Sequence, residues 1–184
     1  MLPGHKGIMG PQGIGVILMS DAFAEACKPI ISGGTGSLSY KDFMPDFMPD
    51  KFQPGTMNIP GIIGMGHGIS FIQAEGIETI EQKKIELTKR FISELLNMKN
   101  VKVIGKQHTE ERCAVVSLDF ISMDNGEVAY ILENEFGIMT RCGIHCAPHA
   151  HKTLGTFPKG TVRFSFGYFN TKEDIKYVID SIKK

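Results

Sequence analysis

Two short stretches of the sequence carry the residues best suited to chemistry. Lys6 follows His5 in a glycine-rich segment, and a lysine amine can bond covalently to an aldehyde. Cys146 follows His145, and Arg141 lies just upstream. A cysteine thiolate near cations is stabilised as a nucleophile, and the following Ala-Pro predicts that Cys146 lies at a helix start. Together these residues suggest an amine that holds an aldehyde cofactor and a cysteine that takes sulfur.

Each of these residues also has a simpler explanation. A lysine in a turn is commonly a surface residue, and an isolated cysteine is commonly a buried structural one. A zinc site is a further alternative, because five cysteines and histidines with suitable spacing lie within ten residues: Cys142, His145, Cys146, His149 and His151. A closed zinc site usually draws its ligands from two separated pairs, and the chain offers no second pair, so we expect no metal.

Three further features could bind anions. Arg163 lies within an apolar and aromatic run, where a buried arginine needs either a substrate carboxylate or an internal salt bridge. Thr56 precedes a predicted helix start, where a hydroxyl and free amides suit phosphate, although capping by Asn58 would also explain the pattern. The glycine-rich stretch 31–37 is either a phosphate cradle or a plain loop, and it lacks the ending of the common phosphate loop.

Composition excludes several classes of protein. The 184 residues include 20 basic and 20 acidic side chains, which cancel, so neither a nucleic-acid surface nor a membrane-binding stripe is indicated. No apolar run approaches the roughly 20 residues that span a bilayer, and the first residues lack the apolar core of a signal peptide. The four scattered cysteines do not form a disulfide framework. We therefore expect a cytoplasmic protein with free thiols.

The first part of the chain predicts irregular structure followed by helices. Residues 1–15 read as a tight turning segment, 15–19 as a short buried strand, and 43–50, which repeats Phe-Met-Pro-Asp, as an extended segment. Asn58 with Pro60 predicts a helix start, and the glycines that follow predict close packing on another element. After Gly76, apolar residues at helical spacing predict a longer helix.

From about residue 100 the pattern alternates between strands and helices. We expect strands at 101–104, 113–120, 137–140 and 161–166, and helices that begin near Asp124 and Thr171. This order predicts an α/β domain. We therefore divide the chain into residues 1–58, an edge of a larger domain, residues 59–99, connecting helices, and residues 100–184, a small α/β domain with the cysteine loop.

The order and spacing of the motifs are more specific than any one of them. Gly-His-Lys-x-x-x-Gly-Pro-x-Gly-x-Gly begins at Gly4, and Gly-Gly-x-Gly and Gly-Thr-x-Asn follow. Arg-x-Gly-x-His-Cys-Ala-Pro begins at Arg141, and Val-Arg-x-Ser-x-x-x-x-Asn-Thr begins at Val162. Across essentially all 184 residues the chain resembles the C-terminal half of a cysteine desulfurase that depends on pyridoxal 5'-phosphate (PLP). This group is the class V aminotransferase family, on the branch that includes selenocysteine lyases.

The resemblance implies the C-terminal part of a PLP-dependent transferase of fold type I. Lys6 would hold the PLP aldehyde and move protons, and His5 would lie beside the PLP phosphate. Thr56 would reach the PLP phosphate in the partner subunit of a homodimer. Arg163 would hold the substrate carboxylate, with Arg141 near the mouth of the site.

By the same resemblance, Cys146 would attack the sulfur of L-cysteine, or the selenium of L-selenocysteine. The products would be L-alanine and a persulfide on Cys146, and the sulfur would pass to an acceptor protein. PLP acts as an electron sink in such chemistry, while a thiolate accepts the sulfur.

The chain also departs from this family pattern. Family members are typically about twice as long, and their N-terminal half supplies the histidine that stacks on the PLP ring and the aspartate that pairs with its nitrogen. Pro3 stands where close relatives have Ser or Thr, and Gln53 stands where they have an acidic residue. We therefore expect a fragment that turns over little or no cysteine alone. Alternatives are another class V aminotransferase or PLP lyase, a split-enzyme subunit, and a non-catalytic interaction module.

Overall fold

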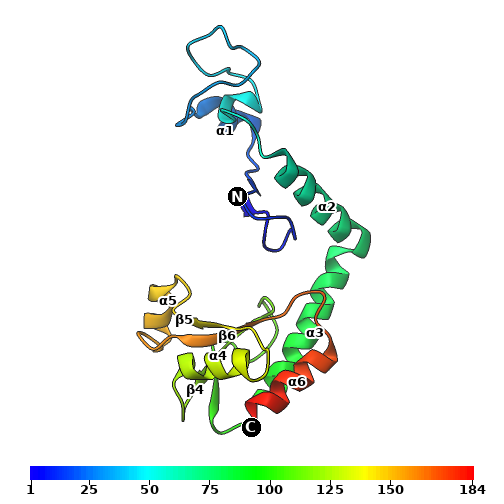
Figure 1. Cartoon of the computed structure of the whole chain (residues 1–184), viewed down its shortest axis with the longest axis vertical. Helices are drawn as coiled ribbons and strands as arrows, with labels where there is room; N and C mark the ends of the chain where they lie inside the picture. The colour runs from blue at the N-terminus through cyan, green and yellow to red at the C-terminus, as the bar shows by residue number, and fades with distance from the viewer. The chain divides into compact units, whose positions relative to one another are not determined.

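The computed structural model describes residues 1–184, which divide into two compact units, Met1–Gly76 and Ile77–Lys184 (Figure 1). The segment 59–99 that the sequence assigned to connecting helices is divided between them. Helix α2 (Ile59–Glu75) belongs to the first unit and helix α3 (Ile77–Leu95) to the second. No helix in the chain has the length and apolarity to cross a lipid bilayer.

The first unit contains little regular structure besides α2. Strands β1 (Leu2–Pro3) and β2 (Gly15–Val16) form an antiparallel pair that closes the glycine-rich segment between them. Helix α1 (Asp21–Ala26) and the short helix η1 (Asp50–Phe52) follow. The predicted turning segment is confirmed, and residues 43–49 form neither helix nor strand.

The prediction of a buried strand over residues 15–19 is wrong. The strand ends at Val16, and the side chains of Ile17 and Leu18 are 54% and 77% exposed. Ile30 and Ile31 are also exposed, at 99% and 71%. An apolar run is buried only where other elements cover it, and the first unit supplies none for this run.

Helix α2 begins where the sequence predicted. The Asn58 side chain accepts a hydrogen bond from the Gly61 amide, and Pro60 occupies the first turn. The close packing predicted from its glycines is also confirmed, because a Cβ on Gly64 would crowd the Pro11 ring and one on Gly68 would overlap the Ile8 carbonyl. A glycine-lined face of α2 therefore supports the segment that carries Lys6.

The second unit is a four-stranded antiparallel sheet covered by helices. Its strands are β3 (Val101–Ile104), β4 (Val115–Phe120), β5 (Arg141–Gly143) and β6 (Thr161–Ser165), in the spatial order β3-β4-β6-β5. Its helices are α3, α4 (Asn125–Asn134), α5 (Pro148–Thr153) and α6 (Lys172–Ile182). This mixed α/β organisation agrees with the predicted fold class (Figure 1).

One hydrophobic core joins α3, α4 and α6 to a single face of this sheet. Phe91 of α3 is fully buried, with its ring centroid 5.1 Å from those of both Phe164 and Phe166. Because side chains alternate along a strand, the residues between the core positions of β4 and β6 lie on the opposite face. That second face carries Ser117 and Arg163, which are cross-strand partners.

The prediction of a strand at residues 137–140 is wrong, because the strand begins later in the chain. Gly137 has a φ of 64°, and the Ile138 amide donates to the Leu132 carbonyl, so these residues end helix α4 instead. Regular pairing begins only at Arg141, opposite Arg163. The predicted helix starts at Asp124 and Thr171 are confirmed, and Thr171 and Asp174 form a reciprocal capping box.

Candidate active site

The predicted site residues belong to both units. His5, Lys6 and Thr56 lie in the first unit, and Arg141, Cys146 and Arg163 lie in the second.

Lys6 lies in the loop between β1 and β2. The loop is closed by hydrogen bonds from the Gly4 amide to the Ile14 carbonyl (2.9 Å) and from the Gly10 amide to the Gly4 carbonyl (2.7 Å). His5 and Lys6 are exposed, and neither side chain has a hydrogen-bond or ion-pair partner within the chain. The Lys6 amine is therefore free to react with an aldehyde, and Gly7 beside it leaves open space for a ring.

Thr56 is linked to this loop through the start of α2. The Asn58 amide group donates to the Gly13 carbonyl at 3.3 Å while its oxygen caps the helix. Thr56 is exposed, next to Gly55 with a φ of 83°. Capping by Asn58 is thus confirmed, and the Thr56 hydroxyl has no partner in the chain. The Lys6 amine suits the aldehyde of a phosphorylated aldehyde, and the Thr56 hydroxyl near a helix N-terminus suits the phosphate of such a group.

Cys146 lies in a tight turn after β5. The Ala147 amide donates to the Ile144 carbonyl at 2.8 Å, and the two central residues, His145 and Cys146, have φ values of 52° and 58°. Left-handed backbone in residues other than glycine costs of order 1–3 kcal/mol each and is found mostly at functional sites. The prediction that Cys146 lies at a helix start needs correction, because α5 begins only at Pro148 and is six residues long.

The turn presents the Cys146 thiol to an arginine. Cys146 is exposed, which excludes the buried structural cysteine, and Arg141 Nη2 lies 3.8 Å from its sulfur. The His145 ring Nε2 donates to the Arg141 carbonyl at 2.8 Å, which ties the turn back to β5. The turn therefore holds a nucleophile against a positive charge.

Arg163 is the second arginine of this group. It is directly opposite Arg141 across β5 and β6, so both side chains leave the same face of the sheet. Arg163 makes no ion pair within the chain, and its buried Nε has no hydrogen-bond partner. The internal salt bridge proposed as an alternative is therefore absent, and the guanidinium is available to an anion.

Electrostatics around the thiol agree with this arrangement. Burial lowers the pKa of His145; its hydrogen bond to the Arg141 carbonyl opposes this, and the charges of Arg163, His151 and Arg141 lower the pKa further. The ring is therefore neutral at neutral pH. Burial also raises the pKa of Cys142, which is the cross-strand partner of core residue Val162 and remains a neutral thiol.

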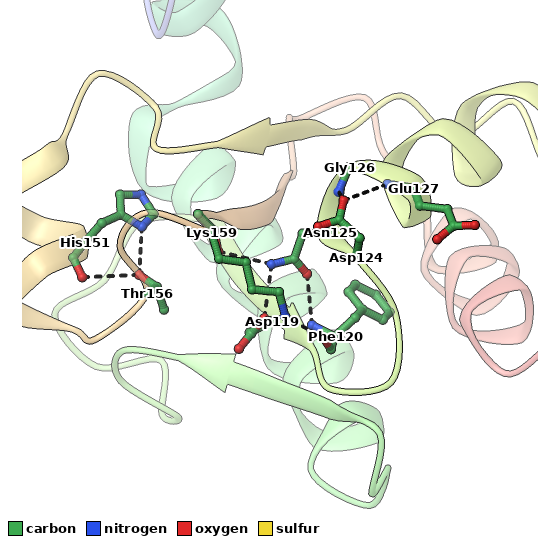
Figure 2. Close-up of polar contacts among 10 residues, drawn as sticks. Asp119, Phe120, Asp124, Asn125, Gly126, Glu127, His151, Thr156 and Lys159 are labelled. Carbon is green, nitrogen blue, oxygen red and sulfur yellow. Dashed lines mark hydrogen bonds and ion pairs between the residues drawn. The ribbon is translucent and has the colours of Figure 1, made fainter.

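A buried polar network supports the turn, and the sequence did not point to it. Asn125 is fully buried: its oxygen accepts from the Phe120 amide (3.0 Å), and its nitrogen donates to Asp119 (3.0 Å) and the Gly160 carbonyl (3.1 Å) (Figure 2). Lys159 contacts Asp119 at 2.6 Å. A Cβ on Gly160 would overlap the Gly143 backbone, so this network holds the loop before β6 against β5.

A second brace lies beyond the cysteine. His151 is buried, and its Nδ1 lies 2.7 Å from the Thr156 hydroxyl (Figure 2). Its ring centroid lies 5.7 Å from that of His145. The zinc alternative gains no support, because no three His, Cys, Asp or Glu side chains converge in a way that could hold a metal ion. The sequence predicts only a helix start at Asp124 and gives no sign that Asn125 is buried.

The glycine-rich stretch 31–37 forms neither helix nor strand. It lines part of a hollow of about 380 Å³ together with residues up to Met44. The Gly55 amide donates to the Gly34 carbonyl at 2.6 Å, which joins this loop to the start of α2.

Comparison with known proteins places these features in a family. The model of the class V aminotransferases matches residues 1–178. A probable cysteine desulfurase from Methanothermobacter thermautotrophicus is 31% identical over 99% of the chain, and one from Pyrococcus abyssi is 37% identical over 94%. The chain spans 46% and 43% of these two relatives, about half of their length.

Solved structures agree with the sequence comparison. The apo structure of a cysteine desulfurase from Thermococcus onnurineus superposes with a TM-score of 0.87, at 33% identity over 98% of the chain and 45% of the known structure. The cysteine desulfurase CsdA of Escherichia coli gives a TM-score of 0.83, at 25% identity over 98% of the chain and 44% of the known structure. The matched family, its motifs and its fold lead to one conclusion: this chain belongs to the class V aminotransferase family and has part of the fold of a cysteine desulfurase.

Proposed function

We propose that this chain forms the C-terminal part of a PLP-dependent cysteine desulfurase, in which Cys146 takes the sulfur of L-cysteine and L-alanine is released. The observation that carries the proposal is the position of an exposed thiol beside Arg141, whose cross-strand partner Arg163 is unpaired. A carboxylate on the substrate would complete the interactions that the two guanidinium groups lack, and this contact would orient the substrate sulfur toward the thiol. L-Selenocysteine has the same carboxylate and is a second substrate candidate.

The residues of the first unit would hold the cofactor. Lys6 would supply the amine for covalent attachment and afterwards move a proton at its Nζ, while His5 would lie near the phosphate. Thr56 would donate a hydrogen bond from its hydroxyl to a phosphate. As the family resemblance implies, this phosphate would belong to the PLP of the partner subunit in a homodimer. When bound, PLP supplies the electron sink that weakens bonds at the substrate α-carbon.

The residues of the second unit would perform the sulfur transfer. The Cys146 thiolate attacks the substrate sulfur, and the Arg141 guanidinium stabilises the negative charge on the sulfur before and after transfer. The neutral His145 ring keeps Arg141 in place through its backbone. The exposure of Cys146 would let an acceptor protein collect the sulfur, in the reducing cytoplasm that keeps such a thiol free.

We further propose that activity requires residues beyond these 184. The chain spans about half of its curated relatives, and the first unit exposes the apolar side chains of Ile17, Leu18, Ile30 and Ile31. Exposed apolar groups of this kind pack against other protein segments in a working assembly. The remaining part of the large domain is the partner that fits this surface.

The experiment that tests the function combines cofactor trapping with turnover. The purified chain is mixed with PLP, reduced with borohydride and mapped by peptide mass, and alanine formation from cysteine is measured with and without an added N-terminal half from a relative. With the added half, PLP trapped on Lys6 and a persulfide on Cys146 are the expected results, whereas the chain alone should form little or no alanine. Full alanine formation by a Cys146→Ala variant would instead indicate a class V lyase that releases the sulfur without Cys146, and cysteine consumption without alanine would indicate an aminotransferase. No activity with any added half would indicate an interaction module.

A further inference from the structure

The cysteine turn has a feature that the proposed function does not require. Arg141, Cys146 and Arg163 all belong to the second unit, where Arg141 contacts the thiol and Arg163 lies opposite Arg141 across the strands, so no residue of the Lys6 loop is needed to position them. A reaction that needs only a nucleophilic sulfur and an anion site could proceed there without PLP.

The charge of this cluster specifies the kind of ligand. Like charges directly opposite each other across two strands destabilise the sheet, and an anion between them would offset this repulsion. Here the pair is uncompensated, since neither arginine forms an ion pair within the chain and the buried Arg163 Nε lacks a partner. Guanidinium groups bind oxyanions through paired hydrogen bonds. A dianion with several oxygens therefore also fits the cluster, because it can offer oxygens to both guanidinium groups.

We propose that this cluster is a sulfurtransferase site for thiosulfate-type donors, which carry a sulfane sulfur on a sulfonate group. The two arginines bind the sulfonate oxygens, and the sulfane sulfur faces Cys146. The thiolate attacks that sulfur, a new S–S bond forms on Cys146, and the S–S bond of thiosulfate breaks. Its electron pair leaves with sulfite, so charge and electrons balance and no other oxidant or reductant takes part.

The geometry favours this step in two ways. The leaving sulfite carries the developing negative charge, and preorganised positive groups that face such a charge lower the barrier. The product persulfide is an anion at the place where Arg141 Nη2 already lies 3.8 Å from the sulfur. The same two charges therefore serve the donor, the leaving group and the product.

The chain contains an internal control for this proposal. Cys113 is also exposed and directly follows Arg112, but the Arg112 guanidinium already donates to the Val115 carbonyl at 2.6 Å and to the Lys106 carbonyl. Cys113 thus has an arginine neighbour that is not free to bind an oxyanion. Thiosulfate should load Cys146 and leave Cys113 unmodified.

The test uses the full chain, freed of PLP and reduced, with thiosulfate as the only sulfur source. Mass spectrometry of the intact chain and of its peptides follows the gain of one sulfur atom, and a colorimetric assay follows sulfite. We expect one sulfur per chain on the peptide containing Cys146, with an equal amount of sulfite. The Cys113→Ser variant should react as the wild type does, and Cys146→Ser should not react.

Two charge variants test the anion site itself. Arg163→Ala and Arg141→Ala should each slow sulfur loading roughly tenfold or more, the rate equivalent of one lost charge-assisted hydrogen bond. Alkylation of Cys146 by the neutral reagent iodoacetamide shows whether each variant retains the folded turn. Equal sulfur loading on Cys113, loading without sulfite, or unchanged rates in both folded variants would overturn the proposal. Because PLP and cysteine are absent, failure here leaves the desulfurase assay unaffected, and failure of that assay leaves this one unaffected.

Discussion

The Arg141 guanidinium lies 3.8 Å from the Cys146 sulfur, in a turn where His145 holds the Arg141 backbone. A positive charge at this distance should attract anionic reagents to the thiol more than neutral ones. The contact comes from a strand and a turn that are adjacent in sequence, so the sequence alone pointed to the right residues.

The first prediction tests this charge by alkylation. In Arg141→Ala, we expect the rate with the anion iodoacetate to fall about fivefold relative to the rate with neutral iodoacetamide, as removal of an exposed charge interaction of about 1 kcal/mol implies. The rate ratio at Cys113 in the same sample serves as the reference. If both reagents slow equally at Cys146, Arg141 acts on the shape of the turn and not through its charge.

The second prediction concerns the glycine face of α2. Gly68→Ala should displace the Lys6 loop, because the added Cβ overlaps the Ile8 carbonyl. Hydrogen exchange at the Gly4 and Gly10 amides, which are bonded within the loop, should then accelerate.

Gly66→Ala is the matched control for this change. Gly66 lies on the same helix, and a Cβ there meets nothing within 4 Å. Alanine should stabilise the helix at this position by about 1 kcal/mol or less without any effect on the loop. Equal exchange in the two variants would show that α2 does not support the loop that carries Lys6.

Much of the second unit could be predicted from sequence because its signals are local. The period of apolar residues in α3 and the Thr171–Asp174 capping box depend on neighbours within one or two helical turns. Arg141 and Arg163 lie opposite each other because of the spatial strand order β3-β4-β6-β5, and this order could not be predicted from the sequence. Only the structure therefore showed that the two arginines form one group.

The errors have equally physical reasons. The αL backbone of His145 and Cys146 contradicts local preference, so Pro148 suggested a helix start that included the cysteine. The apolar run after Gly15 has strand composition, but burial depends on covering elements that the first unit does not contain. Lys51 shows the reverse case, a lysine that is buried because its amine donates to the Ala24 carbonyl at 2.8 Å at the end of α1.

The third prediction concerns the buried network beneath the cysteine strand. Asn125→Ala would leave the Phe120 amide and the Gly160 carbonyl without their partner, which should lower the free energy of unfolding by about 3 kcal/mol. Urea unfolding followed by circular dichroism measures this change. Asn134→Ala, on the same helix but exposed and bonded only to the Tyr130 carbonyl, should cost less than about 1 kcal/mol. Similar losses in both variants would mean that Asn125 contributes only helix propensity.

The fourth prediction follows from the lowered pKa of His145, which burial causes first and the charges of Arg163, His151 and Arg141 reinforce, against its hydrogen bond to the Arg141 carbonyl. Below an ordinary histidine pKa of about 6.5 the unfolded chain binds a proton at His145 that the native turn resists. His145 therefore contributes stability above that pH, and the contribution falls as pH drops toward the lowered native pKa. The His145→Asn variant should lose less stability than the wild type between about pH 7.5 and pH 5, measured by urea midpoints. Asparagine is chosen because it tolerates a left-handed backbone. Other titrating groups are the same in both proteins, so the difference between the two pH profiles reports His145, and identical profiles would show that its ring titrates alike in native and unfolded chains.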